Sequence, residues 1–134
     1  MNPRQWFRVS GGFASAILFA GASLLLVATV PVQAQSAFTV PTTAIGTPSA
    51  TQTVTVNITT SGKLAAIDVL TQGASGLDYS LVAGGGTCAA GTVYTAPTTC
   101  TVQIIFTPTR PWVRYGGISL FDGSNNLLGN SFLN

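Results

Sequence analysis

Hydrophobic and polar residues alternate along much of this chain, and the alternation predicts short β-strands. The clearest cases are residues 51–59 (TQTVTVNIT) and residues 100–107 (CTVQIIFT), in which apolar and polar side chains take turns. A strand with one face in the core and the other in solvent has this period of two. The residues expected on the two buried faces are Val54, Val56, Ile58, Val102, Ile104 and Phe106.

Shorter apolar runs, separated by turn residues, extend this pattern over the chain. Glycine, proline, serine, asparagine and aspartate gather between the runs, as they do in turns. The further segments expected to be strands are residues 38–40, 64–70, 77–82, 117–121 and 127–133. Within residues 77–82 we expect Leu77, Tyr79 and Leu81 to share one face, and we expect Gly84–Gly86 to form a flexible loop.

About seven short strands with regular turns are typical of an immunoglobulin-like sandwich. We therefore predict an all-β fold, an immunoglobulin-like β-sandwich of about seven short antiparallel strands, over residues 51–134. Residues 35–50 are expected to form a mobile lead-in segment before the core. Residues 122–126 (DGSNN) predict a hairpin turn rather than a calcium loop, because a single carboxylate holds calcium poorly.

Residues 1–34 have a different pattern, that of a secretory signal peptide with its signal helix. A positive head precedes an uncharged apolar run at residues 13–30, and small residues lead up to Ala34. We expect cleavage after Ala34, with a second candidate site after Ala37. The apolar run is nearly long enough to cross a bilayer, so an uncleaved membrane anchor is the alternative. The protein is thus expected to be secreted, periplasmic or at the cell surface, touching the membrane only transiently unless the anchor is retained.

Charged residues make up only 6% of the chain, and histidine and glutamate are absent. These absences exclude a Ser-His-Asp triad and imidazole metal sites, and scattered aspartates disfavour a catalytic carboxylate pair. Without the signal peptide the formal charge is zero, which gives no nucleic-acid footprint. We therefore expect no enzymatic activity, cofactor, metal or nucleic-acid partner. Asp68 and Asp78 are interpreted as solvent-facing charges on strands.

Cys88 and Cys100 are the only cysteines. In an exported chain an even pair predicts a disulfide, and a loop of this size contributes about 3 kcal/mol to stability. A redox function would call for the Cys-x-x-Cys spacing, which this pair lacks.

The segment from Arg110 to Tyr115 combines two cations with two aromatic rings. Trp, Tyr and Arg are enriched at binding hot spots, so Arg110, Trp112, Arg114 and Tyr115 are candidate contacts for a protein or a cell-surface glycan. Trp and Tyr rings stack on sugars, and Arg binds carboxylates. In the alternative interpretation, which buried aromatics at sandwich corners favour, Trp112 plugs the core and the arginines are solvated.

Several segments together resemble a known family. Within residues 64–133 they are LAAIDVLTQGASGLDYS, GGGTC, CTVQIIFTPT and RYGGISLFDGSNNLLG. They are similar to the ASH-type, choice-of-anchor D immunoglobulin-like domains of secreted bacterial proteins of acidobacterial type, often N-terminal to NHL-type β-propeller repeats. The most specific part covers residues 88–108. Trp112 departs from the family, which commonly has glycine at this corner.

The resemblance implies a non-catalytic module with a structural, binding or accessory role at the cell surface or outside the cell. Relatives continue into further domains, whereas this sequence ends at Asn134. The alternative is therefore a truncated N-terminal fragment of a larger secreted β-propeller or enzyme protein, with its function in the missing C-terminal part.

Overall fold

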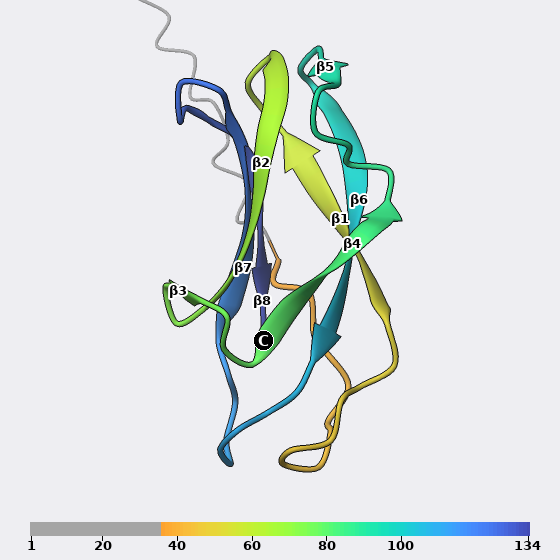
Figure 1. The fold of residues 1–134 in the computed structure, drawn as a ribbon, viewed down its shortest axis with the longest axis vertical. Helices are drawn as coiled ribbons and strands as arrows, with labels where there is room; N and C mark the ends of the chain where they lie inside the picture. Colours follow the sequence, from red (N-terminus) through yellow and green to blue (C-terminus); the bar gives the residue numbers. More distant parts are fainter. Residues whose placement is uncertain (1–35) are drawn as a thin grey trace, which may run out of the picture. The chain divides into compact units, whose positions relative to one another are not determined.

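The computed structural model describes residues 36–134, and this part of the chain consists of β-strands and their connections (Figure 1). No helix occurs within it. The strands are β1 (Gln52–Ile58), β2 (Gly62–Thr71), β3 (Ala74–Ser75), β4 (Tyr79–Gly86), β5 (Val93–Tyr94), β6 (Thr98–Phe106), β7 (Gly116–Asp122) and β8 (Leu127–Leu133). The predicted all-β fold is confirmed for the described residues.

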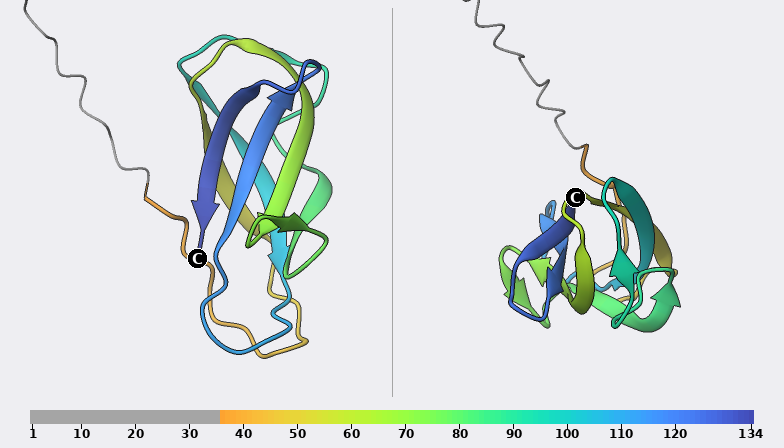
Figure 2. Two further views of the ribbon diagram at one scale, coloured as in Figure 1. Left: turned by 90° about the vertical axis from the view of Figure 1, so that its left-hand side faces the viewer. Right: turned by 90° about the horizontal axis from the view of Figure 1, so that it is seen from above.

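The strands form one curled sheet in the order β3-β2-β7-β8-β1-β6-β4, and β5 pairs with β2. Pairings between these named strands are antiparallel. β1 pairs with β8 only at Asn57 and Ile58, so the sheet folds there into two layers, β2-β7-β8 and β1-β6-β4 (Figure 2). In chain order these are the C-F-G and B-E-D neighbours of an immunoglobulin-like sandwich.

Residues 38–40 take the place of the first strand of the sandwich and run parallel to β8. The Phe38 N–H donates to the carbonyl of Phe132 at 2.8 Å, and the Asn134 N–H donates to the carbonyl of Phe38 at 3.0 Å. The predicted opening strand is therefore present as an isolated bridge, but its pairing is parallel rather than antiparallel. The bridge covers part of the free edge of β8.

The lead-in segment makes defined contacts well before Thr51. Val40 is 7% exposed and belongs to the hydrophobic core. Ser49 donates its N–H to the Phe106 carbonyl at 2.8 Å, and its hydroxyl oxygen accepts from the Phe106 N–H at 3.0 Å. The packed domain thus includes residues ahead of Thr51, because their apolar side chains and backbone groups find partners on the sandwich.

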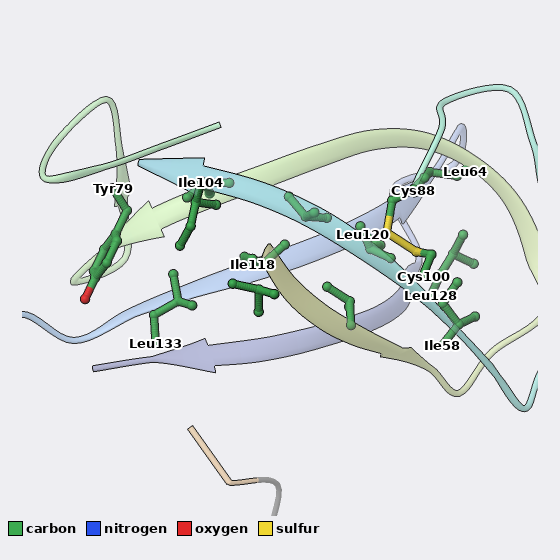
Figure 3. Close-up of a cluster of buried hydrophobic side chains, with 14 of the residues drawn as sticks. Ile58, Leu64, Tyr79, Cys88, Cys100, Ile104, Ile118, Leu120, Leu128 and Leu133 are labelled. Atoms are coloured by element: carbon green, nitrogen blue, oxygen red, sulfur yellow. A yellow bond between two sulfur atoms is a disulfide. The ribbon is translucent and has the colours of Figure 1, made fainter. Parts of the chain in front are cut away.

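The alternating apolar positions of β1 and β6 form the centre of the core, as the sequence predicts (Figure 3). All of the side chains expected on these inner faces are at most 9% exposed. They meet apolar side chains from the other layer. The core residues contributed by β2, β7 and β8 are Leu64, Val69, Ile118, Leu120, Leu128 and Leu133.

The region of β4 departs from the predicted alternation. Tyr79 is buried as expected, whereas Leu77 and Leu81 are 50% and 40% exposed. Residues 84–86 continue β4 instead of forming a loop, with a register shift against β6. The φ of Gly86 is +86°, a conformation that glycine adopts without steric cost, so a glycine-rich sequence here bends a strand rather than ending it.

The predicted signal peptide, its helix and the cleavage site after Ala34 lie outside the described residues. The alternative of an uncleaved anchor falls on the same part of the chain. Within residues 36–134 no helix has the length and apolar character needed to cross a membrane.

Candidate functional site

The disulfide between Cys88 and Cys100 links the connection just after β4 to β6. The two Cα atoms are 5.0 Å apart, and both cysteines are buried. Figure 3 shows the bond close to Leu64 and Leu128, toward one end of the core cluster, with Tyr79 at the other end. The predicted disulfide is confirmed, and a bond of this kind fits an oxidising compartment.

A pocket of about 480 Å³ is lined by the lead-in segment and by the loop of residues 107–115, which we call the corner loop. Figure 1 shows these two segments at the same end of the sandwich. We call this pocket the corner pocket. Its lining comes from residues 39–43 and Ile45, from Tyr79 and Phe106, and from the corner loop. Three of the predicted contact residues line it, namely Arg110, Trp112 and Arg114. The fourth, Tyr115, is an exposed residue of the same loop.

Trp112 is 90% exposed at the rim of the corner pocket, so the interpretation that it plugs the core is wrong. Tyr79 fills that end of the core instead, and its ring stacks on Phe106 with 4.7 Å between centroids. The φ of Trp112 is +81°, a strained conformation for a bulky side chain. Val113 and Tyr115 are 61% and 64% exposed, so the corner loop does not alternate between a core face and a solvent face.

A buried charge pair fastens the corner loop to the start of β4. The Asp78 side chain is fully buried, and Arg114 donates from Nε to its Oδ2. Thr109 donates to Oδ1 from its hydroxyl at 2.7 Å and from its N–H at 3.3 Å. Burial raises the pKa of Asp78, but the donors of Thr109 and Arg114 outweigh burial and hold this pKa below its ordinary value. The carboxylate is therefore charged at neutral pH.

The interpretation of Asp78 as a solvent-facing strand charge is wrong. Asp78 and its neighbour Tyr79 are both 1% exposed, because the chain turns just before β4 and a strict alternation does not apply there. Asp68 on β2 is exposed, as predicted. Arg114 is not a solvated cation, since its side chain is 14% exposed and its charge is matched by Asp78.

Tyr79 forms the second attachment of the corner loop. Its hydroxyl donates to the carbonyl of Arg114 at 2.8 Å. Burial, together with the nearby charge of Asp78, raises the pKa of Tyr79 to about 12, so the hydroxyl keeps its proton and remains a donor. Asp78 and Tyr79 thus anchor the corner loop to the sandwich, while the side chains of Trp112, Val113 and Tyr115 remain in solvent.

Arg110 is the cation of the corner pocket that has no counter-charge. It is exposed, it lines the pocket, and within residues 36–134 its guanidinium takes part in no ion pair or hydrogen bond. Asn134 also lines the pocket, and its Oδ1 is buried without a hydrogen-bond partner. The pocket therefore combines an apolar lining with one uncompensated positive charge.

The remaining aspartates are placed away from the corner pocket. Asp122 closes the β7–β8 hairpin, accepting hydrogen bonds from the N–H groups of Ser124 and Asn126 at 2.8 Å each. The side-chain amide of Asn126 also donates to Asp122 and is the main cause of its lowered pKa. The predicted hairpin turn is confirmed. No group of three or more potential metal ligands occurs within residues 36–134.

Sequence reasoning found the corner loop but missed the opposite wall of its pocket. Residues 39–45 contain no charged residue and no regular alternation of apolar and polar residues, so their sequence does not indicate that they line a pocket. The pairing of Asp78 with Arg114 joins residues on different elements, and no local pattern indicates it.

Comparisons with protein-family models, with curated proteins and with solved structures find no match to this chain. The resemblance to ASH-type domains therefore stays a prediction drawn from the residues themselves.

Proposed function

We propose that this protein is an exported, non-catalytic immunoglobulin-like module that binds a protein or a cell-surface glycan through its corner pocket. The observation that carries the proposal is the position of Trp112, 90% exposed on strained backbone beside a pocket. Local strain of this kind persists where surrounding contacts impose it, and it is concentrated at functional sites. Exposing a large aromatic ring has no benefit for folding, whereas it is favourable for binding.

The absence of catalytic groups supports a binding role. The chain contains neither histidine nor glutamate. Asp78 is neutralised by Arg114, and Asp122 is engaged in its hairpin. Asp68 is therefore the remaining carboxylate, and acid–base hydrolysis of a glycan needs two.

Export is supported by two features from different parts of the chain. The first residues have the pattern of a signal peptide, and the Cys88–Cys100 disulfide fits an oxidising compartment. The similarity of residues 64–133 to ASH-type domains points to the same setting, at the cell surface or outside the cell.

The binding proposal is tested by probing the mature domain on a glycan array and against a displayed library of random peptides. We expect at least one ligand class to bind, to be lost in Trp112→Gly and to be kept in Phe132→Ala. Glycine suits the positive φ of position 112, so the fold survives the change. Phe132 is a matched control, because it is an aromatic residue 49% exposed on β8. If no ligand binds, or if all ligands bind Trp112→Gly equally well, the proposal is wrong.

Export is tested by the intact mass of the protein secreted from its host. The expected chain begins at Gln35, or at Phe38 if the second cleavage site is used. Recovery of full-length protein in the membrane fraction would show an anchor instead.

A further inference from the structure

The lining of the corner pocket is mainly apolar, which bears on the kind of partner it accepts. Val40, Pro41 and Ile45 face it from the lead-in segment, and Phe106 and Pro108 from the other side. A sugar in such a pocket would lose water from several hydroxyls and would find few hydrogen-bond partners along the apolar part of the lining in exchange. Each unpaired polar group costs about 1–3 kcal/mol. A bulky apolar group loses nothing of this kind, and the volume of about 480 Å³ is in the range of ordinary ligand pockets.

The hydroxyl groups at the pocket are few. They come from Thr39, Thr42, Thr43 and Tyr79. The hydroxyl of Thr43 donates to the carbonyl of Pro41 at 3.1 Å, and that of Tyr79 donates to the carbonyl of Arg114 at 2.8 Å. An apolar occupant is thus a better fit than a polar one.

The charge at the pocket points to an anionic group beside the apolar one. Arg114 is neutralised by Asp78, whereas Arg110 has no counter-charge. The other aspartates, Asp68 on β2 and Asp122 at the β7–β8 hairpin, do not line the pocket. An arginine guanidinium binds a carboxylate with two parallel hydrogen bonds, a geometry that lysine cannot reproduce.

The rim of the pocket has the character of a protein-binding surface. Trp112 and Val113 line the pocket and are more than half exposed, and Tyr115, a neighbour in the same loop, is also more than half exposed. Asp78 and Tyr79 anchor that loop to the sandwich, so the loop loses little conformational freedom when a partner binds. Tryptophan, tyrosine and arginine are the residues most enriched among those that dominate protein–protein affinity.

Building on the binding role proposed above, we propose that the partner is a protein. One segment of that partner places a bulky apolar side chain in the corner pocket and an aspartate or glutamate carboxylate on Arg110. The apolar lining receives the first group, the unmatched guanidinium receives the second, and the exposed side chains of Trp112 and Val113 at the rim lie beside both.

The test uses the mature domain and peptides selected from a random twelve-residue display library. Selected sequences should combine Phe, Leu or Trp with a neighbouring Asp or Glu. The best peptide is then synthesised together with a version in which the acidic residue is replaced by its amide. We expect the wild-type domain to bind the acidic peptide at least about tenfold more tightly than the amide peptide, which corresponds to about 1.4 kcal/mol.

Two variants identify the side chain that binds the carboxylate of the peptide. Arg110→Gln should bind the acidic and amide peptides equally, both at the weaker affinity. Lys63→Gln removes a different exposed cation, on β2, and should retain the full preference. Arg110 is exposed and unpaired, so its replacement should leave folding intact, and a thermal melt of the variant checks this.

The outcomes separate this inference from the function on which it rests. Trp112-dependent binding to glycans without any peptide binding would overturn the inference and leave the binding module standing. Selected peptides without acidic residues, or an acid preference that survives Arg110→Gln, would also overturn it. If neither glycans nor peptides bind in a Trp112-dependent manner, both proposals fail.

Discussion

The two ends of the sandwich are closed in different ways. At one end the Cys88–Cys100 bond lies among buried aliphatic side chains such as Leu64. At the other end the corner loop is held by the Asp78–Arg114 charge pair and by the hydroxyl of Tyr79. The first end is fastened by a covalent bond and apolar packing, the second by polar contacts with directional geometry.

This difference explains why Trp112 and Tyr115 of the corner loop can remain exposed. Polar contacts from Asp78 and Tyr79 reach the backbone and one arginine of the corner loop, so the loop does not depend on burying Trp112. A loop anchored by apolar packing would have to place its large side chains inward. Because the Asp78–Arg114 ion pair anchors the corner loop, the apolar side chains of the loop remain available to bind another molecule.

Among changes to the charged residues, the largest effect on stability is expected from Arg114→Met. The change leaves the carboxylate of Asp78 buried without its cation, and breaking a buried pair costs about 3–5 kcal/mol. Urea unfolding measures the loss. Lys63→Met, which removes an exposed cation, should change stability by less than about 0.5 kcal/mol. A loss below about 1 kcal/mol in Arg114→Met would mean that the polar contacts do not fasten the corner loop.

The disulfide end should show the next largest effect. Replacing both cysteines by serine lowers stability by about 2–4 kcal/mol, because the unfolded chain gains freedom when the loop is opened. Reducing the wild-type protein should lower its stability by a similar amount. The oxidised protein should contain no thiol that reacts with an alkylating agent. Two reactive thiols in folded, air-exposed protein would contradict the bond.

Acid should weaken the contacts that Asp78 makes at the corner end. The pKa of Asp78 is lowered in the folded protein, so its stabilising effect is complete above the unfolded value of about 4 and is lost as the pH falls through the folded value. Denaturant unfolding at a series of pH values should show this decline below about pH 4. Asp78→Asn removes the titrating group, and the decline should become shallower. An unchanged acid profile in Asp78→Asn would assign the effect to other groups.

The smallest effect on stability is expected at Trp112, the residue that matters most to the proposed function. Trp112→Gly removes an exposed ring and relieves the positive φ, so the melting temperature should stay the same or rise slightly. The buried ring at this end gives the contrast, since Tyr79→Ala should lower stability by about 3–5 kcal/mol. A fall of several degrees in Trp112→Gly would show that the ring supports the fold.

The strands with a strict alternation could be predicted from the sequence. β1 and β6 obey a period of two throughout, and the burial of Val56 and Ile104 follows from that period alone. The β7–β8 hairpin could also be predicted from the sequence, because Asp122 and the residues after it are of the types that form turns. These features depend on contacts between near neighbours.

The features that sequence reasoning missed depend on distant partners. The two-residue strands β3 and β5 exist only through their pairing with β2. The burial of Asp78 depends on Arg114, 36 residues further along the chain. General frequency favours the alternative in which Trp112 plugs the core, whereas in the structure Tyr79 already occupies that space. The candidate residues were found by composition, but their division into anchors and exposed contacts needed the fold.

The parallel bridge between residues 38–40 and β8 gives the domain a mechanical property. Phe38 donates to the Phe132 carbonyl, Asn134 donates to the Phe38 carbonyl, and Val40 donates to the Asn134 carbonyl. Because the two segments run in the same direction, a pull that separates residue 38 from residue 134 along the strands loads these hydrogen bonds in shear. A hairpin pulled open from its ends loses its hydrogen bonds one after another. Here they must break together before either segment leaves the sandwich, so the pairing acts as a clamp against tension between these two points.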